Sequence, residues 1–198
     1  MRNSCIFYDK KVSVSSIIHR VEYLYHMYPV LKLKKKIRCI GIRPKIFYPC
    51  GFFDGATAGN IGGAGFALLL GESHTLGFSL GCGMSTNTRA ELLALWALLV
   101  VSKHLGIPLL TIFGDSLVIL NWENRNASLE SPSLDHWCKE IRSLMYNFSW
   151  LTIKHIYREH NQQVDCLSKK ALVLDPSFGF FTEYLDGMII DHGNFHLF

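Results

Sequence analysis

Short apolar runs separated by glycines dominate the chain between residues 46 and 80. Residues 46–54, 64–70 and 74–80 are each rich in apolar side chains, with several phenylalanines and leucines among them. Runs of this length, bounded by turn-forming residues, predict β-strands. The connections, residues 55–63 and 71–73, are short and contain glycine, so we expect the three strands to pair in antiparallel order.

After residue 85 the apolar positions follow a helical period. Residues 88–105 predict one long helix, and its longest apolar run, residues 92–101, is shorter than the ~20 residues that cross a bilayer. The rest of the pattern predicts a strand at 109–114, a short helix from 116, a helix at 134–147, a strand at 151–157 and a helix from 161. This order of strands and helices indicates a mixed α/β domain.

The two ends of the chain differ from this middle region. Residues 16–28 have helical apolar spacing that ends at Pro29, and a basic stretch, residues 32–38, follows. We therefore expect three parts: a basic N-terminal segment with one amphipathic helix (1–45), an α/β domain (46–175) and a C-terminal tail (176–198).

Charge is distributed unevenly along the chain. The net charge is +4, but residues 1–50 carry +9 and residues 51–198 carry −5. Affinity for a polyanion would therefore depend on the N-terminal segment and on bound cations more than on a general positive field. The six cysteines show no CxxC pair and no regular spacing, so we expect neither a zinc site nor disulfides. This favours an intracellular protein of the nucleus or cytoplasm. We also expect a monomer with no membrane partner, since no apolar run is long enough to cross a bilayer.

Four acidic residues stand in distinctive settings: Asp54, Glu91, Asp115 and Asp165. Three of them follow or interrupt strongly apolar stretches, where an unpaired carboxylate costs several kcal/mol. Divalent cations such as Mg2+ would compensate for them, because these ions take carboxylate oxygens as ligands. Each acid also has an ordinary explanation: a turn opener, a capping box with Thr88, a helix cap and a solvated acid near a helix start, in the same order.

The order and context of these acids resemble the type 1 ribonuclease H domain, in the retroelement-derived, reverse-transcriptase-like form common in plant genomes. The resemblance covers roughly residues 47–173 and includes the motif TNTRAELLAL around Glu91. It also includes the spacing of six and then four residues from His155 through Asn161 to Asp165. It implies a ribonuclease H-like fold with a mixed five-stranded sheet, three antiparallel strands followed by two parallel ones, flanked by helices.

The resemblance further implies a metal-dependent endonuclease that hydrolyses the RNA strand of RNA/DNA hybrids by a two-metal-ion mechanism, with Mg2+ or alternatively Mn2+ as cofactor. The catalytic metal ligands would be Asp54, Glu91, Asp115 and Asp165. His155 would be a further catalytic residue that moves a proton or helps product leave, with a strand-facing structural histidine as the alternative. Contacts to nucleic acid would come from Asn60, Thr86, Asn87 and Asn161.

Other functions remain open at this point. A domesticated retroelement domain could bind hybrid or RNA with weak or no cleavage, and residues 121–137 favour this alternative because they lack the basic protrusion of bacterial relatives. A 3′ to 5′ exonuclease on a related fold would need Asp-x-Glu on its first strand, whereas Asp54 is followed by Gly55 and Ala56. The glycines of GNIGGAG lack GxGxxG spacing and lead into a strand, which excludes a dinucleotide-binding loop.

Overall fold

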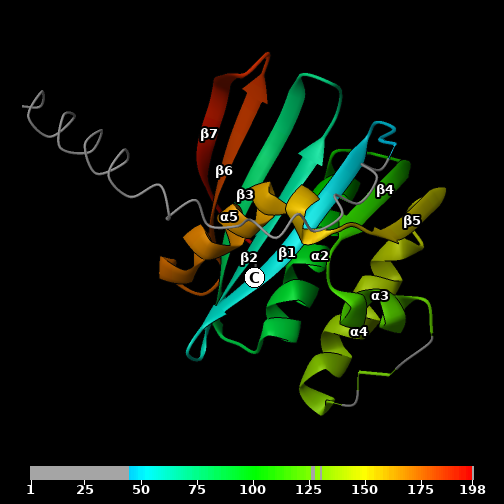
Figure 1. Cartoon of the computed structure of the whole chain (residues 1–198), viewed down its shortest axis with the longest axis vertical. Helices are drawn as coiled ribbons and strands as arrows, with labels where there is room; N and C mark the ends of the chain where they lie inside the picture. Colours follow the sequence, from blue (N-terminus) through cyan, green and yellow to red (C-terminus); the bar gives the residue numbers. More distant parts are fainter. Residues whose placement is uncertain (1–44, 126–127, 130, 198) are drawn as a thin grey trace, which may run out of the picture. The chain divides into compact units, whose positions relative to one another are not determined.

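The computed structural model describes residues 45–197 except 126, 127 and 130, and Figure 1 shows their arrangement. The strands of this part are β1 (Cys50–Ala58), β2 (Ile61–Leu69), β3 (His74–Met84), β4 (Leu109–Gly114), β5 (Trp150–His155), β6 (Phe178–Leu185) and β7 (Met188–His196). The helices are α2 (Asn87–His104), α3 (Leu117–Glu123), α4 (Pro132–Met145) and α5 (Gln162–Lys170), with short 3-10 turns η2 (Arg158–His160) and η3 (Ala171–Val173). The helix expected at 16–28 and the basic stretch 32–38 lie outside the described residues.

The strands form one sheet in the order β5-β4-β1-β2-β3-β6-β7. Strand β4 runs parallel to both β1 and β5, and the other neighbouring pairs are antiparallel. Helix α5 packs on β1, β2 and β3 and crosses in front of them in Figure 1, whereas α2 packs on β1 and β2 from behind. The predicted mixed sheet flanked by helices is therefore confirmed.

Helix α2 is apolar on nearly all sides because it has neighbours on two sides. Its leucines pack against the sheet, and α4 covers its other side, where the rings of Trp96 and Trp137 meet edge to face at 5.3 Å. A helix that is apolar all round is typical of a buried element. None of the helices in the described part of the chain is both long and apolar enough to cross a membrane.

The glycine-rich stretch 55–63, which we expected to be a turn, mostly lies within strands. The hairpin turn is only Gly59 and Asn60, and the glycines on either side of it belong to β1 and β2. The physical reason is the close approach of a helix to the sheet. A Cβ atom on Gly55 would lie 2.3 Å from the backbone nitrogen of Glu91, so a larger residue would push α2 away. Asp54 is consequently in the middle of a strand and not at its end.

The expected number of five strands is wrong, because residues 178–196 form β6 and β7 where we expected a tail. β6 pairs with β3, and β7 pairs with β6. The extension covers an apolar edge: Phe78 on β3 stacks on Phe66 and also contacts Phe181 and Phe195. The hairpin turn is Asp186-Gly187, with φ of 52° and 78°, and Asp-Gly is a strong hairpin signal that the sequence contained.

Candidate active site

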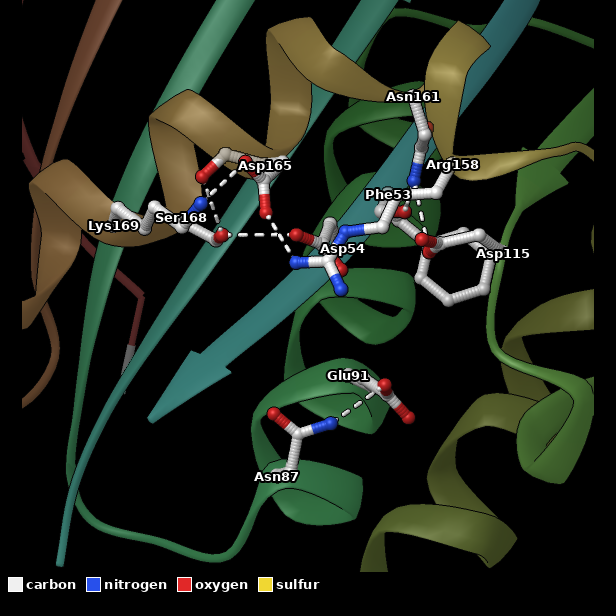
Figure 2. A network of polar contacts seen from close by, with 10 residues as sticks. All are labelled: Phe53, Asp54, Asn87, Glu91, Asp115, Arg158, Asn161, Asp165, Ser168 and Lys169. Carbon is white, nitrogen blue, oxygen red and sulfur yellow. Dashed lines mark hydrogen bonds and ion pairs between the residues drawn. The ribbon is translucent and has the colours of Figure 1, made fainter. Parts of the chain in front are cut away.

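The four acids meet where the pairing between strands β1 and β4 ends. The pairing of β1 with β4 stops at Phe52, so Asp54 has no β4 residue beside it. Asp115 directly follows β4, at the carboxyl end of this parallel strand, where sheets of this kind place functional groups. Helices α2 and α5 bring Glu91 and Asp165 to the same region, and Figure 2 shows all four side chains.

Asp54 is buried, with 9% of its surface exposed. Burial, followed by the negative charge of Asp115, raises the pKa of its carboxyl to about 6, against the opposing effect of a hydrogen bond from Ser168. The Ser168 hydroxyl lies 3.0 Å from Asp54 Oδ2. The pKa of Asp54 is raised because burial and the neighbouring carboxylate both disfavour its negatively charged form.

Glu91 lies on the second turn of α2. The N-cap is Thr86, whose Oγ1 accepts a hydrogen bond from the backbone N–H of Arg89, so the alternative of a capping box with Thr88 is wrong. Ser116 Oγ donates to Glu91 Oε2 at 2.5 Å, and Asn87 Nδ2 donates to Oε1 at 2.8 Å. Burial nevertheless raises the pKa of Glu91 to about 7, with the charges of Asp54 and Asp115 adding to it.

Asp115 is held by Asn161. The Asn161 side-chain amide donates from Nδ2 to Asp115 Oδ1 at 3.1 Å and to the main-chain oxygen of Phe53 at 3.0 Å (Figure 2). Asn161 is only 1% exposed and ties the start of α5 to both β1 and the end of β4. Its contact with nucleic acid remains a prediction.

Asp165 differs from the other three acids because two cations hold it. Lys169 Nζ lies 2.6 Å from its Oδ2 and Arg158 Nη2 lies 3.1 Å from its Oδ1 (Figure 2). The hydrogen bond from Lys169, followed by that from Arg158, lowers the pKa of Asp165, against an opposing effect of burial. Asp165 is therefore ionised and ion-paired in the metal-free protein.

The other predicted residues lie around this cluster. His155 is the last residue of β5, pairs with Gly114 next to Asp115, and is exposed with its ring edge-on to Tyr157. Asn60 is in the exposed β1–β2 turn, and its main-chain oxygen accepts a hydrogen bond from Ser85, beside Thr86. Asn87 is exposed but also holds Glu91. The structure thus gathers Asn60, Thr86 and Asn87 on one rim, and their contacts with nucleic acid remain predictions.

The donor set fits a hard divalent cation. Four carboxylates supply oxygen ligands of the kind Mg2+ takes, and the like charges that raise the pKa of Asp54 and Glu91 are what such an ion would offset. The buried Oδ1 of Asn161 has no hydrogen-bond partner among the described residues. However, across residues 45–197, gaps aside, no three His, Cys, Asp or Glu side chains form a ready metal cage. We attribute this to Asp165 and Glu91, whose carboxylates are turned toward Lys169 and Ser116.

From the sequence alone we did not identify four residues whose side chains bind the acids. Ser116 follows Asp115 directly, Ser168 and Lys169 lie three and four residues after Asp165, and Arg158 lies seven before it. The helical spacing of Lys169 could have indicated its ion pair, because residues four apart on a helix are neighbours. No local signal could have linked Ser168 to Asp54, which is 114 residues away in the chain.

Comparison with known proteins agrees with this geometry. Residues 52–171 match the family model described as reverse transcriptase-like. The chain is 30% identical over 126 residues to ribonuclease HI of Halobacterium salinarum and 32% identical over 129 residues to the uncharacterized protein YpeP of Bacillus subtilis, with 61% of this chain covered in each case. It spans about three fifths of the length of these curated relatives, 62% and 57%.

A solved structure shows the same fold. The crystal structure of RNase H1 from the halophilic archaeon Halobacterium salinarum superposes with a TM-score of 0.59 and 28% sequence identity, over 63% of this chain and 96% of that one. The family match covers more than half of the 198 residues. The chain therefore belongs to the reverse transcriptase-like family and contains a ribonuclease H domain.

Proposed function

We propose that the chain is a divalent-metal-dependent endonuclease that cuts the RNA strand of RNA/DNA hybrids. The observation that carries this proposal is the meeting of four carboxylates from β1, α2, the end of β4 and α5, each with its own side-chain hydrogen-bond donor. A fold needs no such cluster for stability, since the burial that raises the pKa of Asp54 and Glu91 is unfavourable for ionised carboxylates. Clusters of acidic side chains with shifted pKa values are typical of functional sites.

The relatives support the proposed substrate class. The curated relative and the solved structure from Halobacterium salinarum are named ribonuclease HI and RNase H1. The exposed rim formed by Asn60, Thr86 and Asn87 supports a duplex partner, because an A-like helix displays its 2′-hydroxyls in a wide, shallow minor groove that short polar side chains can reach.

The acids would hold the metal, Mg2+ or alternatively Mn2+, and the other side chains would position the acids. Bound divalent cations supply an activated water and stabilise the departing 3′-oxygen in two-metal phosphodiester hydrolysis. Asn161 orients Asp115, while Ser116 and Asn87 orient Glu91. Exposed His155, at the end of β5, would accept or deliver a proton at the rim of the site.

One observation favours a second function, binding of hybrid or RNA without cleavage. Lys169 and Arg158 contact both carboxylate oxygens of Asp165, so a metal that binds this acid must compete with two cations. A domain that kept both ion pairs with substrate bound would have three acids, in place of four, that no cationic side chain holds. Such a domain would still bind hybrid or RNA, but its rate of cleavage would fall.

Cleavage of a strand-labelled substrate separates the two functions. We would incubate the full chain with a hybrid labelled on the RNA or on the DNA strand, in Mg2+ or in EDTA, with duplex RNA and duplex DNA of the same sequence as controls. Cleavage of the RNA strand alone, in Mg2+ alone, to fragments with 3′-hydroxyl ends is the expected result. Saturable binding of the hybrid with an intact RNA strand would support the second function and contradict the first.

A further inference from the structure

Ser168 is a fully buried residue of α5 with two polar neighbours. Its Oγ lies 3.0 Å from Asp54 Oδ2 and 3.0 Å from the main-chain oxygen of Asp165. A hydroxyl has a single proton, so it can donate to only one of these oxygens at a time. An ionised carboxylate is the stronger acceptor, because hydrogen bonds to charged groups are shorter and stronger than those between neutral groups.

The fold places Ser168 over Asp54 through a glycine. Asp54 on β1 and Gly65 on β2 are paired across the sheet, so their side-chain positions lie on the same face. A Cβ atom on Gly65 would lie 2.3 Å from the backbone nitrogen of Ser168. Helix α5 therefore rests with its main chain directly on β2, and any larger residue at this point would lift the Ser168 hydroxyl away from Asp54.

We propose that Ser168 is a positioning residue that fixes the carboxylate of Asp54 through Oδ2 before a divalent cation binds. This inference rests on the proposed function, since it assigns Asp54 to the metal site. The bond also ties Asp54 to the helix that carries Asp165, so two proposed ligands from distant parts of the chain share one support. Without the hydroxyl, the buried carboxylate would have more freedom to turn from the negative charge of Asp115.

The chain contains a matched control for this residue. Ser102 is also a fully buried serine within a helix, α2, and its Oγ has no hydrogen-bond partner among the described residues. Ser102→Ala and Ser168→Ala remove the same atom from equally buried positions. Only Ser168→Ala removes a bond to a proposed metal ligand, so the difference between the two variants isolates that bond.

The test measures Mg2+ binding to the metal-free full chain by calorimetry, together with melting temperature and hybrid cleavage. We expect Ser168→Ala to bind Mg2+ about tenfold more weakly than the wild type, because a hydrogen bond to a charged group is removed. Its metal-free melting temperature should fall below that of Ser102→Ala, because a buried carboxylate oxygen loses its donor. Its cleavage rate should return at saturating Mg2+, whereas a merely structural role would leave a deficit there.

The outcomes distinguish this inference from the proposed function. Equal Mg2+ affinity in Ser168→Ala and the wild type would overturn the positioning role alone, as would an equal loss in Ser102→Ala. A wild type that binds Mg2+ and loses affinity on Ser168→Ala, but cuts no hybrid, would overturn the proposed function and leave the positioning role standing. A wild type that binds no Mg2+ would overturn both.

Discussion

At the scale of single residues, each acid is placed by a partner that is distant in sequence or on another element. Ser168 holds Asp54, and Asn161 holds Asp115, across 114 and 46 residues of chain. The first bond gives a donor to a buried carboxylate oxygen, and the second gives one to a partly buried oxygen. The chemistry of the site thus depends on uncharged polar side chains as much as on the acids themselves.

His155 is the residue whose role has the most direct kinetic test. We expect His155→Ala to slow hybrid cleavage by about 10- to 100-fold, below the full effect of a general acid or base, because water can partly replace the imidazole. The loss of cleavage rate should become smaller as pH rises, because solvent then takes over the proton. The matched control is His104→Ala, an exposed histidine at the far end of α2, which should keep the wild-type rate. A wild-type rate in His155→Ala would make it a structural residue of β5.

At the scale of elements, the C-terminal hairpin completes the sheet. Phe195 on β7 lies with its ring 5.9 Å from that of buried Phe78, in an edge-to-face contact. β3 would otherwise present an apolar, unpaired edge of the kind that promotes aggregation. The hairpin therefore packs against the domain core with partly buried side chains.

A pair of substitutions on β7 tests this. Phe195→Ala should lower the free energy of unfolding by about 1–3 kcal/mol, less than the cost of truncating a fully buried phenylalanine, because Phe195 is only partly buried. Exposed Ile190→Ala on the same strand should change it by no more than about 0.5 kcal/mol. Urea denaturation measures both. Equal, small effects would show that the hairpin is an appendage.

Most elements of the fold were predictable from apolar periodicity, and the exceptions have physical causes. Strand β4 and helix α2 have near-expected bounds because long apolar runs mark them. We predicted a turn at the glycines of β1 and β2, because the sequence alone does not show whether a glycine bends the chain or allows a helix to pack closely against the strand. The motifs of the sequence indicated the four acids that the fold brings together. The donors to Asp54 and Asp115, which are Ser168 and Asn161, arise only from tertiary contacts.

At the scale of the whole molecule, the buried acids of the site lower the free energy of unfolding of the metal-free protein at neutral pH. The pKa of Asp54 is raised from 3.8 to about 6 and that of Glu91 from 4.5 to about 7. Both carboxyls therefore bind protons more tightly in the folded chain than in the unfolded one. Their contribution to stability is fully present below about pH 4 and is lost as pH rises through 6 and 7.

This linkage predicts a pH-dependent difference between two proteins. In EDTA, the Asp54→Asn, Glu91→Gln double variant should be more stable than the wild type at pH 8 by a few kcal/mol, up to about 3 kcal/mol for each group, and should lose this advantage near pH 4. Urea unfolding of both proteins at pH 4, 6 and 8 measures it. A constant difference across this range would show that the two acids titrate normally.

The charge asymmetry of the chain makes a second prediction at this scale. Replacing Lys32, Lys34, Lys35, Lys36 and Arg38 with glutamine should weaken hybrid binding and flatten its salt dependence. Removing one ionic interaction with a phosphate reduces the slope of log affinity against log salt by about 0.9 on B-DNA, and comparably on a hybrid. Catalysis at saturating substrate should survive. An unchanged slope in a salt titration would limit this stretch to the role of a linker.

Strand-specific cleavage by the wild type and by Asp54→Asn, purified side by side, tests the central claim most directly. The claim is that the four clustered acids form a divalent-metal site that cuts the RNA strand of a hybrid. The account predicts Mg2+-dependent cleavage of the RNA strand by the wild type and only background cleavage by Asp54→Asn, which folds at least as stably. Equal cleavage by both preparations would contradict the claim, because the activity would then come from another site or another protein.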